Sequence, residues 1–140
     1  YFLKTFCTCL IMHKYFGTEV GVVSGFLTIL GHIYPIWLKF KGGKGVASYM
    51  GFMLATSWPL FIVLIITWLV IVKIFKYSAV AAIISILINL ISFKMILFSQ
   101  FNYNILLWIK GDPIEFQFIL FISIIILIKH YTNVINIFKK

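Results

Sequence analysis

The sequence predicts an all-α, polytopic membrane helix bundle, and three observations lead to this prediction. Of the 140 residues, 63% are hydrophobic and the mean hydropathy is +1.11, whereas soluble domains are roughly 45–50% apolar. Charged residues are few and lie mostly between apolar runs. Turn-forming residues divide the chain into segments of a length that suits membrane helices. We expect residues 1–140 to form a single integral membrane domain.

The apolar runs, taken in chain order, define the expected helices. Gly17 begins a turn after the first run, and Trp58-Pro59 interrupts the third, because proline lacks the N–H that a continuing helix needs. The polar stretch 100–115 is expected to form a loop with a short interfacial helix around residues 105–109. The expected spans are Phe2–Phe16, Val20–Leu38, Val46–Thr56, Leu60–Phe75, Ser78–Ser99 and Phe116–Ile128.

Val46–Thr56 is short for a membrane span, but the distribution of lysine among the loops favours a crossing by this segment. Lysine-bearing short loops usually share the cytoplasmic side of a membrane. With about six spans, all the acidic residues fall on the other side. A run of about 12 residues rises only about 18 Å, so this crossing needs bilayer thinning, shelter inside the bundle or helix continuing through Pro59. The lysines that then share one side are Lys4 and those of residues 39–44, 73–76 and 129–140.

The net charge of +9 comes from 12 basic residues, all of them lysine, and three acidic ones. A basic chain can bind nucleic acid, but these lysines lie between apolar segments and not on a soluble basic face, so we exclude a nucleic-acid partner. Topology and attraction to an anionic lipid or substrate explain them better. Cys7 and Cys9 have no accompanying His/Cys set, and no metal or cofactor site is predicted.

The stretch from Gly31 to Gly51 is the main candidate for a ligand site. It holds a cluster of cations and glycines, and such a cluster should face water at a membrane surface. Glycines allow backbone N–H groups to approach a ligand, and a glycine-rich turn that leads into a helix can bind an anion. We interpret the stretch as a phosphate-binding loop, with a purely topological role for the lysines as the alternative. Its cations are Lys39, Lys41 and Lys44, and its glycines around Lys44 are Gly42, Gly43 and Gly45.

A second candidate lies at the end of the last helix. His130 and Asn133 are three residues apart and share one helix face. Histidine suits proton transfer near neutral pH, and asparagine can hold a hydroxyl or carbonyl oxygen. The alternative is a solvated histidine at a charged helix end. His32 presents a similar choice between a role at the cation loop and packing inside the bundle. Because all three carboxylates are assigned to the opposite side, we favour transfer chemistry on a phosphorylated substrate.

The stretch GHIYPIWLKFKGGKGVAS resembles the central motif of the bacterial acyl-phosphate:glycerol-3-phosphate acyltransferase family (PlsY), which is close to GHxxPxFxxFKGGKGVAT. Ser48 stands where threonine is usual. KHYTNVINIF resembles the family motif RHxxNIxRL, in which His130 and Asn133 match while Asn136 replaces a usual arginine. Ser78 matches an aromatic–Ser–Ser segment. The family's N-terminal SGNxGATNxxR motif and first helix are expected to precede Tyr1, which would complete a fold of seven membrane helices.

The resemblance implies an enzyme that moves a fatty acyl group from acyl phosphate to glycerol 3-phosphate. The product is 1-acylglycerol 3-phosphate (lysophosphatidate), used in phospholipid biosynthesis. It further implies a multi-pass protein of the bacterial inner membrane that needs no cofactor and whose active site faces the cytoplasm and membrane lipid. His130 and Asn133 would be required for activity. The implied substrate-binding residues are Lys39, Lys41, Gly42, Gly43, Lys44, Gly45, Ser48 and Ser78.

Two other hypotheses compete with this one. The chain could be an inactive, truncated remnant of such an enzyme, because one motif of the family site is expected upstream of Tyr1. It could also be a small anion transporter with the GGKG loop as a gate, although the sequence lacks the internal repeat that many transporters have.

Overall fold

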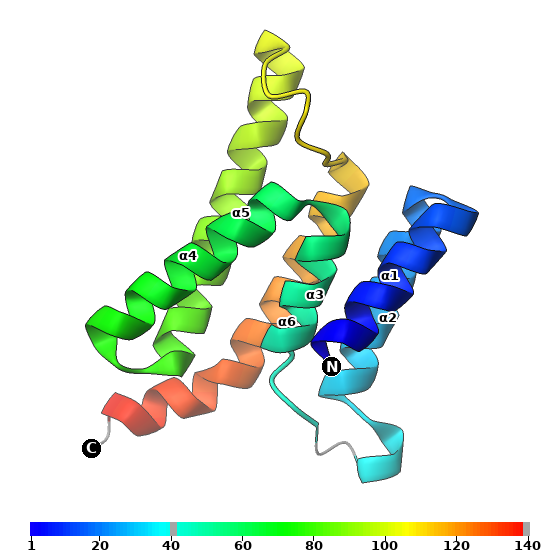
Figure 1. Ribbon diagram of the computed structural model, residues 1–140. Coiled ribbons are helices and arrows are strands. Elements are labelled where there is room, and N and C mark those ends of the chain that lie inside the picture. Colours follow the sequence, from blue (N-terminus) through cyan, green and yellow to red (C-terminus); the bar gives the residue numbers. More distant parts are fainter. Residues whose placement is uncertain (40–41, 139–140) are drawn as a thin grey trace.

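A computed structural model describes residues 1–39 and 42–138, apart from the side chains of residues 37, 132–134 and 136–138. All regular structure in this described part is helical (Figure 1). The elements are α1 (Phe2–Phe16), α2 (Thr18–Ile33), the 3₁₀ helix η1 (Ile36–Leu38), α3 (Val46–Thr56), α4 (Trp58–Phe75), α5 (Ser78–Tyr103) and α6 (Pro113–Phe138). The predicted all-α bundle is therefore confirmed.

Successive helices run in alternating directions, so the connections gather at two ends of the bundle (Figure 1). One end, here called the GGKG end, carries the α2–α3 loop, the α4–α5 turn and the C-terminal part of α6. The other, the carboxylate end, carries Gly17, Ser57 and the loop of residues 104–112. Glu19, Asp112 and Glu115 line one cavity there. The predicted separation of acidic residues from the lysine-rich loops is thus present.

Three of the described helices are long and apolar enough to cross a membrane alone, namely α4, α5 and residues Pro113–Tyr131 of α6. The segments Thr18–Ile33 and Val46–Thr56 are apolar but shorter. α3 packs against α1, α2, α4 and α6, and its Tyr49, Phe52 and Met53 are fully buried. α3, the shortest α-helix, is therefore sheltered by its neighbours. Shelter inside the bundle was one of the three solutions expected for this short segment.

Two local predictions were wrong. The span expected to run to Leu38 ends as an α-helix at Ile33, because Pro35 disfavours helical geometry in the preceding residue and lacks an N–H. The helix expected around residues 105–109 is a turn. The side-chain amide of Gln100 donates to the carbonyls of Leu106 and Ile109 at 2.9 and 2.8 Å, which satisfies backbone groups that a helix would otherwise pair.

A buried polar network fixes the α4–α5 pair against α3. The Asn89 amide donates to the Leu60 carbonyl at 2.7 Å, and the Tyr49 hydroxyl donates to Asn89 Oδ1 at 3.3 Å. Both Asn89 and Tyr49 have no exposed surface. Since polar groups inside a membrane bundle are costly unless paired, this network favours one arrangement of the three helices. That arrangement forms the wall of the cavity described next.

Candidate active site

The GGKG loop packs directly on the C-terminal end of α2. The Gly43 N–H donates to the His32 carbonyl at 3.2 Å. A Cβ on Gly42 would overlap the carbonyls of His32 and Ile33, and one on Gly43 would overlap the His32 imidazole. Glycine at these positions is therefore required by close approach to α2. The same approach leaves Lys44, which is exposed, at the surface of the loop.

Gly45 ends the loop and precedes the first residue of α3. Its φ of 81° lies in the left-handed region, and a Cβ there would stand 2.7 Å from Ile33 Cδ1 and 3.3 Å from Ile126 Cγ1. Gly45→Ala is therefore expected to lower the unfolding free energy by about 2–4 kcal/mol through backbone strain and overpacking. Thermal unfolding in detergent measures the loss.

The matched control for this substitution is Gly31→Ala. Gly31 lies in α2, and a Cβ there meets nothing within 4 Å. Alanine is the better helix former by about 0.5–1 kcal/mol, so Gly31→Ala should leave the melting temperature equal or slightly higher. Equal losses in the two variants would contradict the close packing described for Gly45.

A cavity of about 500 Å³ opens beside the loop at the GGKG end. Its polar side carries His32, Lys44 and Ser78, and its opposite side is apolar. The cavity thus combines a polar, charged part with an apolar wall. The apolar wall is formed by side chains of α3, α4 and α5. The apolar lining consists of Val46, Ala47, Met50, Ile65, Trp68, Leu69 and Ala82.

Two helices begin at residues that line this cavity. α3 begins after Gly45 and α5 begins at Ser78, and both positions line it. Among the described residues, no side chain caps the first turn of either helix. The first N–H groups of a helix have no internal partner, and the helix dipole adds partial positive charge there. Together with Lys44 these ends form a site for an anion, such as a phosphate.

His130 lies in α6 next to this loop and is only 2% exposed. Its Nδ1 is 3.0 Å from the Ile126 carbonyl. Because a carbonyl can only accept, Nδ1 carries the hydrogen and Nε2 of the neutral ring is free to accept a proton or hydrogen bond. Ile126, one turn before His130, lies against Gly45 of the loop, since a Cβ on that glycine would stand 3.3 Å from Ile126 Cγ1. Lys129 Nζ lies 4.4 Å from the centre of the Tyr34 ring, which ties α6 to the chain after α2.

The other predicted residues are distributed as follows. Ser48 is buried, and its hydroxyl pairs with His32 at 2.6 Å. Lys39 is exposed, ends η1 in a left-handed conformation and is not among the residues described as lining the cavity. Lys41 and the side chain of Asn133 lie outside the described residues. Trp68, which no motif in the sequence marks, also lines the cavity.

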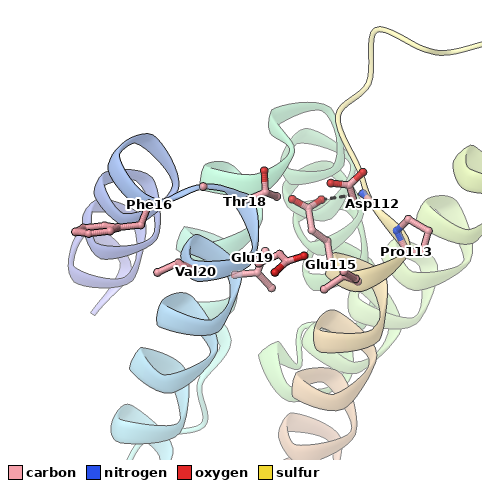
Figure 2. Close-up of a pocket in the computed structure, with 10 residues that line it drawn as sticks. Phe16, Thr18, Glu19, Val20, Asp112, Pro113 and Glu115 are labelled. Atoms are coloured by element: carbon pink, nitrogen blue, oxygen red, sulfur yellow. Dashed lines mark hydrogen bonds between the residues drawn. The ribbon is translucent and has the colours of Figure 1, made fainter.

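A larger cavity, of about 630 Å³, lies at the carboxylate end (Figure 2). Glu19 of α2 and Asp112 and Glu115 at the start of α6 gather around it, and the Asp112 N–H donates to Glu115 Oε2 at 3.1 Å. Three carboxylates repel an anionic ligand, so this cavity does not suit a phosphorylated substrate. The cavity with Lys44 is the better candidate despite its smaller volume.

Comparison with known proteins shows which family the chain resembles. The chain is similar to glycerol-3-phosphate acyltransferases of Bartonella henselae, with 38% identity over 112 residues, and of Anaplasma marginale (strain Florida), with 37% identity over 134 residues. These matches cover 80% and 95% of this chain but 47% and 61% of the relatives. The chain thus spans about half to three fifths of the length of these relatives.

The fold is similar to crystal structures of PlsY, an integral membrane glycerol 3-phosphate acyltransferase. The lysophosphatidic acid form has a TM-score of 0.79 and 29% identity, and the glycerol 3-phosphate form 0.80 and 28%. Each match covers 99% of this chain and about 65% of PlsY (65% and 64%). The family profile "Glycerol-3-phosphate acyltransferase" matches residues 2–140. The chain therefore belongs to the glycerol-3-phosphate acyltransferase family.

Proposed function

We propose that this chain carries the substrate site of an acyltransferase that moves a fatty acyl group from acyl phosphate to the 1-hydroxyl of glycerol 3-phosphate. The products would be lysophosphatidate and inorganic phosphate. The family assignment supports this reaction, and so does the glycerol 3-phosphate form of the similar PlsY structure. The residues proposed to bind substrate are the described Lys39, Gly42, Gly43, Lys44, Gly45 and Ser78, together with Lys41, while Ser48 is proposed to act through His32.

One observation carries the proposal: the cavity beside Lys44 joins an anion-binding end to an apolar wall. Both substrates carry a phosphate, and one also carries a fatty chain. The two uncapped helix N-termini and Lys44 suit the phosphates. The wall around Met50 and Trp68 suits the chain, which can enter from the surrounding lipid. A soluble anion alone would not need that wall.

The proposed step is a direct acyl transfer. The 1-hydroxyl oxygen attacks the acyl carbonyl carbon, the bond from that carbon to the phosphate oxygen breaks, and inorganic phosphate leaves. The hydroxyl proton passes to a base or to the leaving phosphate. We assign His130 and Asn133 to positioning the reacting groups, with Nε2 of His130 as an acceptor. Lys44 and the helix N-termini would stabilise the negative charge.

The test is acyl transfer by the natural protein in membranes that lack other acyltransferases. Palmitoyl phosphate and radiolabelled glycerol 3-phosphate should give labelled lysophosphatidate, and omission of palmitoyl phosphate should abolish it. Binding of glycerol 3-phosphate without any product would support the inactive-remnant hypothesis instead. Uptake of label into sealed vesicles without palmitoyl phosphate would support an anion transporter.

We further propose that the GGKG end faces the cytoplasm of a bacterial inner membrane, because that end carries most of the lysine-bearing loops. In a chain with Cys7 and Cys9 changed to serine, Lys73→Cys should react with a membrane-impermeant maleimide in inside-out vesicles and not in spheroplasts. Asp112→Cys, at the carboxylate end, should show the opposite pattern. Both positions are exposed. Labelling of Lys73→Cys in spheroplasts alone would reverse the orientation.

A further inference from the structure

His32 contacts the GGKG loop and α3 at the same time. It lies in the last turn of α2, its carbonyl accepts the Gly43 N–H at 3.2 Å, and its Nδ1 pairs with Ser48 Oγ at 2.6 Å. Tyr1 stacks on the imidazole with ring centres 3.7 Å apart. The hydrogen bond to Ser48 therefore restrains rotation of the ring within its plane, and the stacked Tyr1 ring covers one of its faces.

The imidazole also limits how close the loop can come to α2. A Cβ on Gly43 would overlap Nε2 and the neighbouring carbons of the ring. Gly43 therefore rests on the ring, and Lys44 follows at once in the chain. Ser48 is fully buried, so its hydroxyl serves the imidazole and is not directed at solvent. The resemblance implied that Ser48 binds substrate, whereas these contacts indicate that Ser48 holds the imidazole of His32.

We propose that His32 is a positioning residue of the anion-binding loop, held by Ser48 and supporting Gly43, so that Lys44 and the N-terminus of α3 converge on one phosphate. This inference rests on the proposed function, because it concerns how that site binds glycerol 3-phosphate. His32 also lines the cavity beside Lys44, so the proposed support lies at the proposed binding site itself. The imidazole fixes the distance between loop and helix, and Ser48 fixes the orientation of the imidazole.

Ligand-dependent thermal shift tests this role without requiring turnover. Glycerol 3-phosphate should raise the melting temperature of the purified natural protein. His32→Ala should raise the concentration needed for half of this shift about tenfold. Ser48→Ala should also raise this half-shift concentration, but by less than His32→Ala. Ser48→Thr keeps the hydroxyl, so its half-shift concentration should be close to that of the natural protein. His13→Ala, at the carboxylate end, is the matched control and should not change the half-shift concentration.

A double substitution tests the contact itself. Gly43→Ala should lower the melting temperature of the wild-type background, because the new methyl group meets the ring. In the His32→Ala background the same change should cost much less, because the ring is gone. Equal costs in the two backgrounds would show that the imidazole does not support the loop and would overturn the proposal.

Kinetics separate positioning from general stability. If the protein is active, His32→Ala should raise the KM for glycerol 3-phosphate about tenfold and keep kcat within about threefold. A fall in kcat with unchanged KM and unchanged half-shift concentration would also overturn the proposal. An inactive wild-type protein that still binds glycerol 3-phosphate and shows the Gly43–His32 coupling would reject the proposed reaction alone.

Discussion

Lys44→Ala is expected to raise the KM for glycerol 3-phosphate by roughly 10- to 100-fold, the cost of losing a hydrogen bond to a charged group of about 1.5–3 kcal/mol. Lys44 stands at the entrance of the cavity, beside the N-termini of α3 and α5. The substitution removes the only full charge of the described cavity lining and leaves the backbone donors. Steady-state acyl transfer at varied glycerol 3-phosphate concentration measures the change, and kcat should remain within about threefold.

Lys73→Ala is the matched control. Lys73 is also exposed and lies in the last turn of α4 at the same end of the bundle, but it is not among the described residues that line the cavity. A general effect of surface charge would act on both lysines and would weaken with salt. If the two variants raised the KM equally, Lys44 would not be a specific ligand of the phosphate.

His130→Ala is expected to lower kcat by about 100-fold or more and to change the KM for glycerol 3-phosphate by less than about threefold. The imidazole is buried, its Nδ1 is committed to the Ile126 carbonyl, and Ile126 itself lies against Gly45 of the loop. Its second nitrogen is therefore held in one direction by the first, although His130 is not among the described residues that line the cavity. Loss of such a group removes stabilisation that matters mainly in the transition state.

Because His130 is buried, the alanine variant could lose activity by losing fold. His130→Gln keeps most of the volume and a hydrogen-bonding group, so a normal melting temperature with low kcat in this variant would separate the two effects. His13→Ala, in a half-exposed position near the end of α1, serves as the control histidine. Near-normal kcat in both His130 variants would contradict a catalytic role.

The order and direction of the helices could be predicted from local signals. Gly17 has a φ of 96°, and Pro59 lies in the first turn of α4, so both act where their chemistry suggested. The lysine distribution favours a crossing by the short α3, because without it the lysine clusters of residues 39–44 and 73–76 would fall on opposite sides of the membrane. These inferences need only the neighbouring residues or a count of the membrane crossings between charged loops.

The cavity could not be predicted in the same way, because it depends on which helices meet. Trp68 and Leu69 belong to α4 and Ser78 to α5, and they line the cavity only because α4 packs against α3 and α5 packs against α4. The pairing of His32 with Ser48 joins residues 16 apart in the sequence. The two hypotheses left open for His32 were a role at the loop and packing within the bundle, and its contacts combine both.

The shortness of α3 has a consequence for where the proposed reaction would occur. With 11 residues it rises about 16 Å, roughly half of a 30 Å hydrocarbon layer. Unless the bilayer thins around the bundle, the two ends of α3 cannot both lie at a membrane surface, and water would then reach one of them below that surface. A loop sunk in this way would let a water-soluble phosphate descend to the level where acyl ester groups of lipids normally lie. The newly acylated product would then already be at its final depth and could leave sideways between helices.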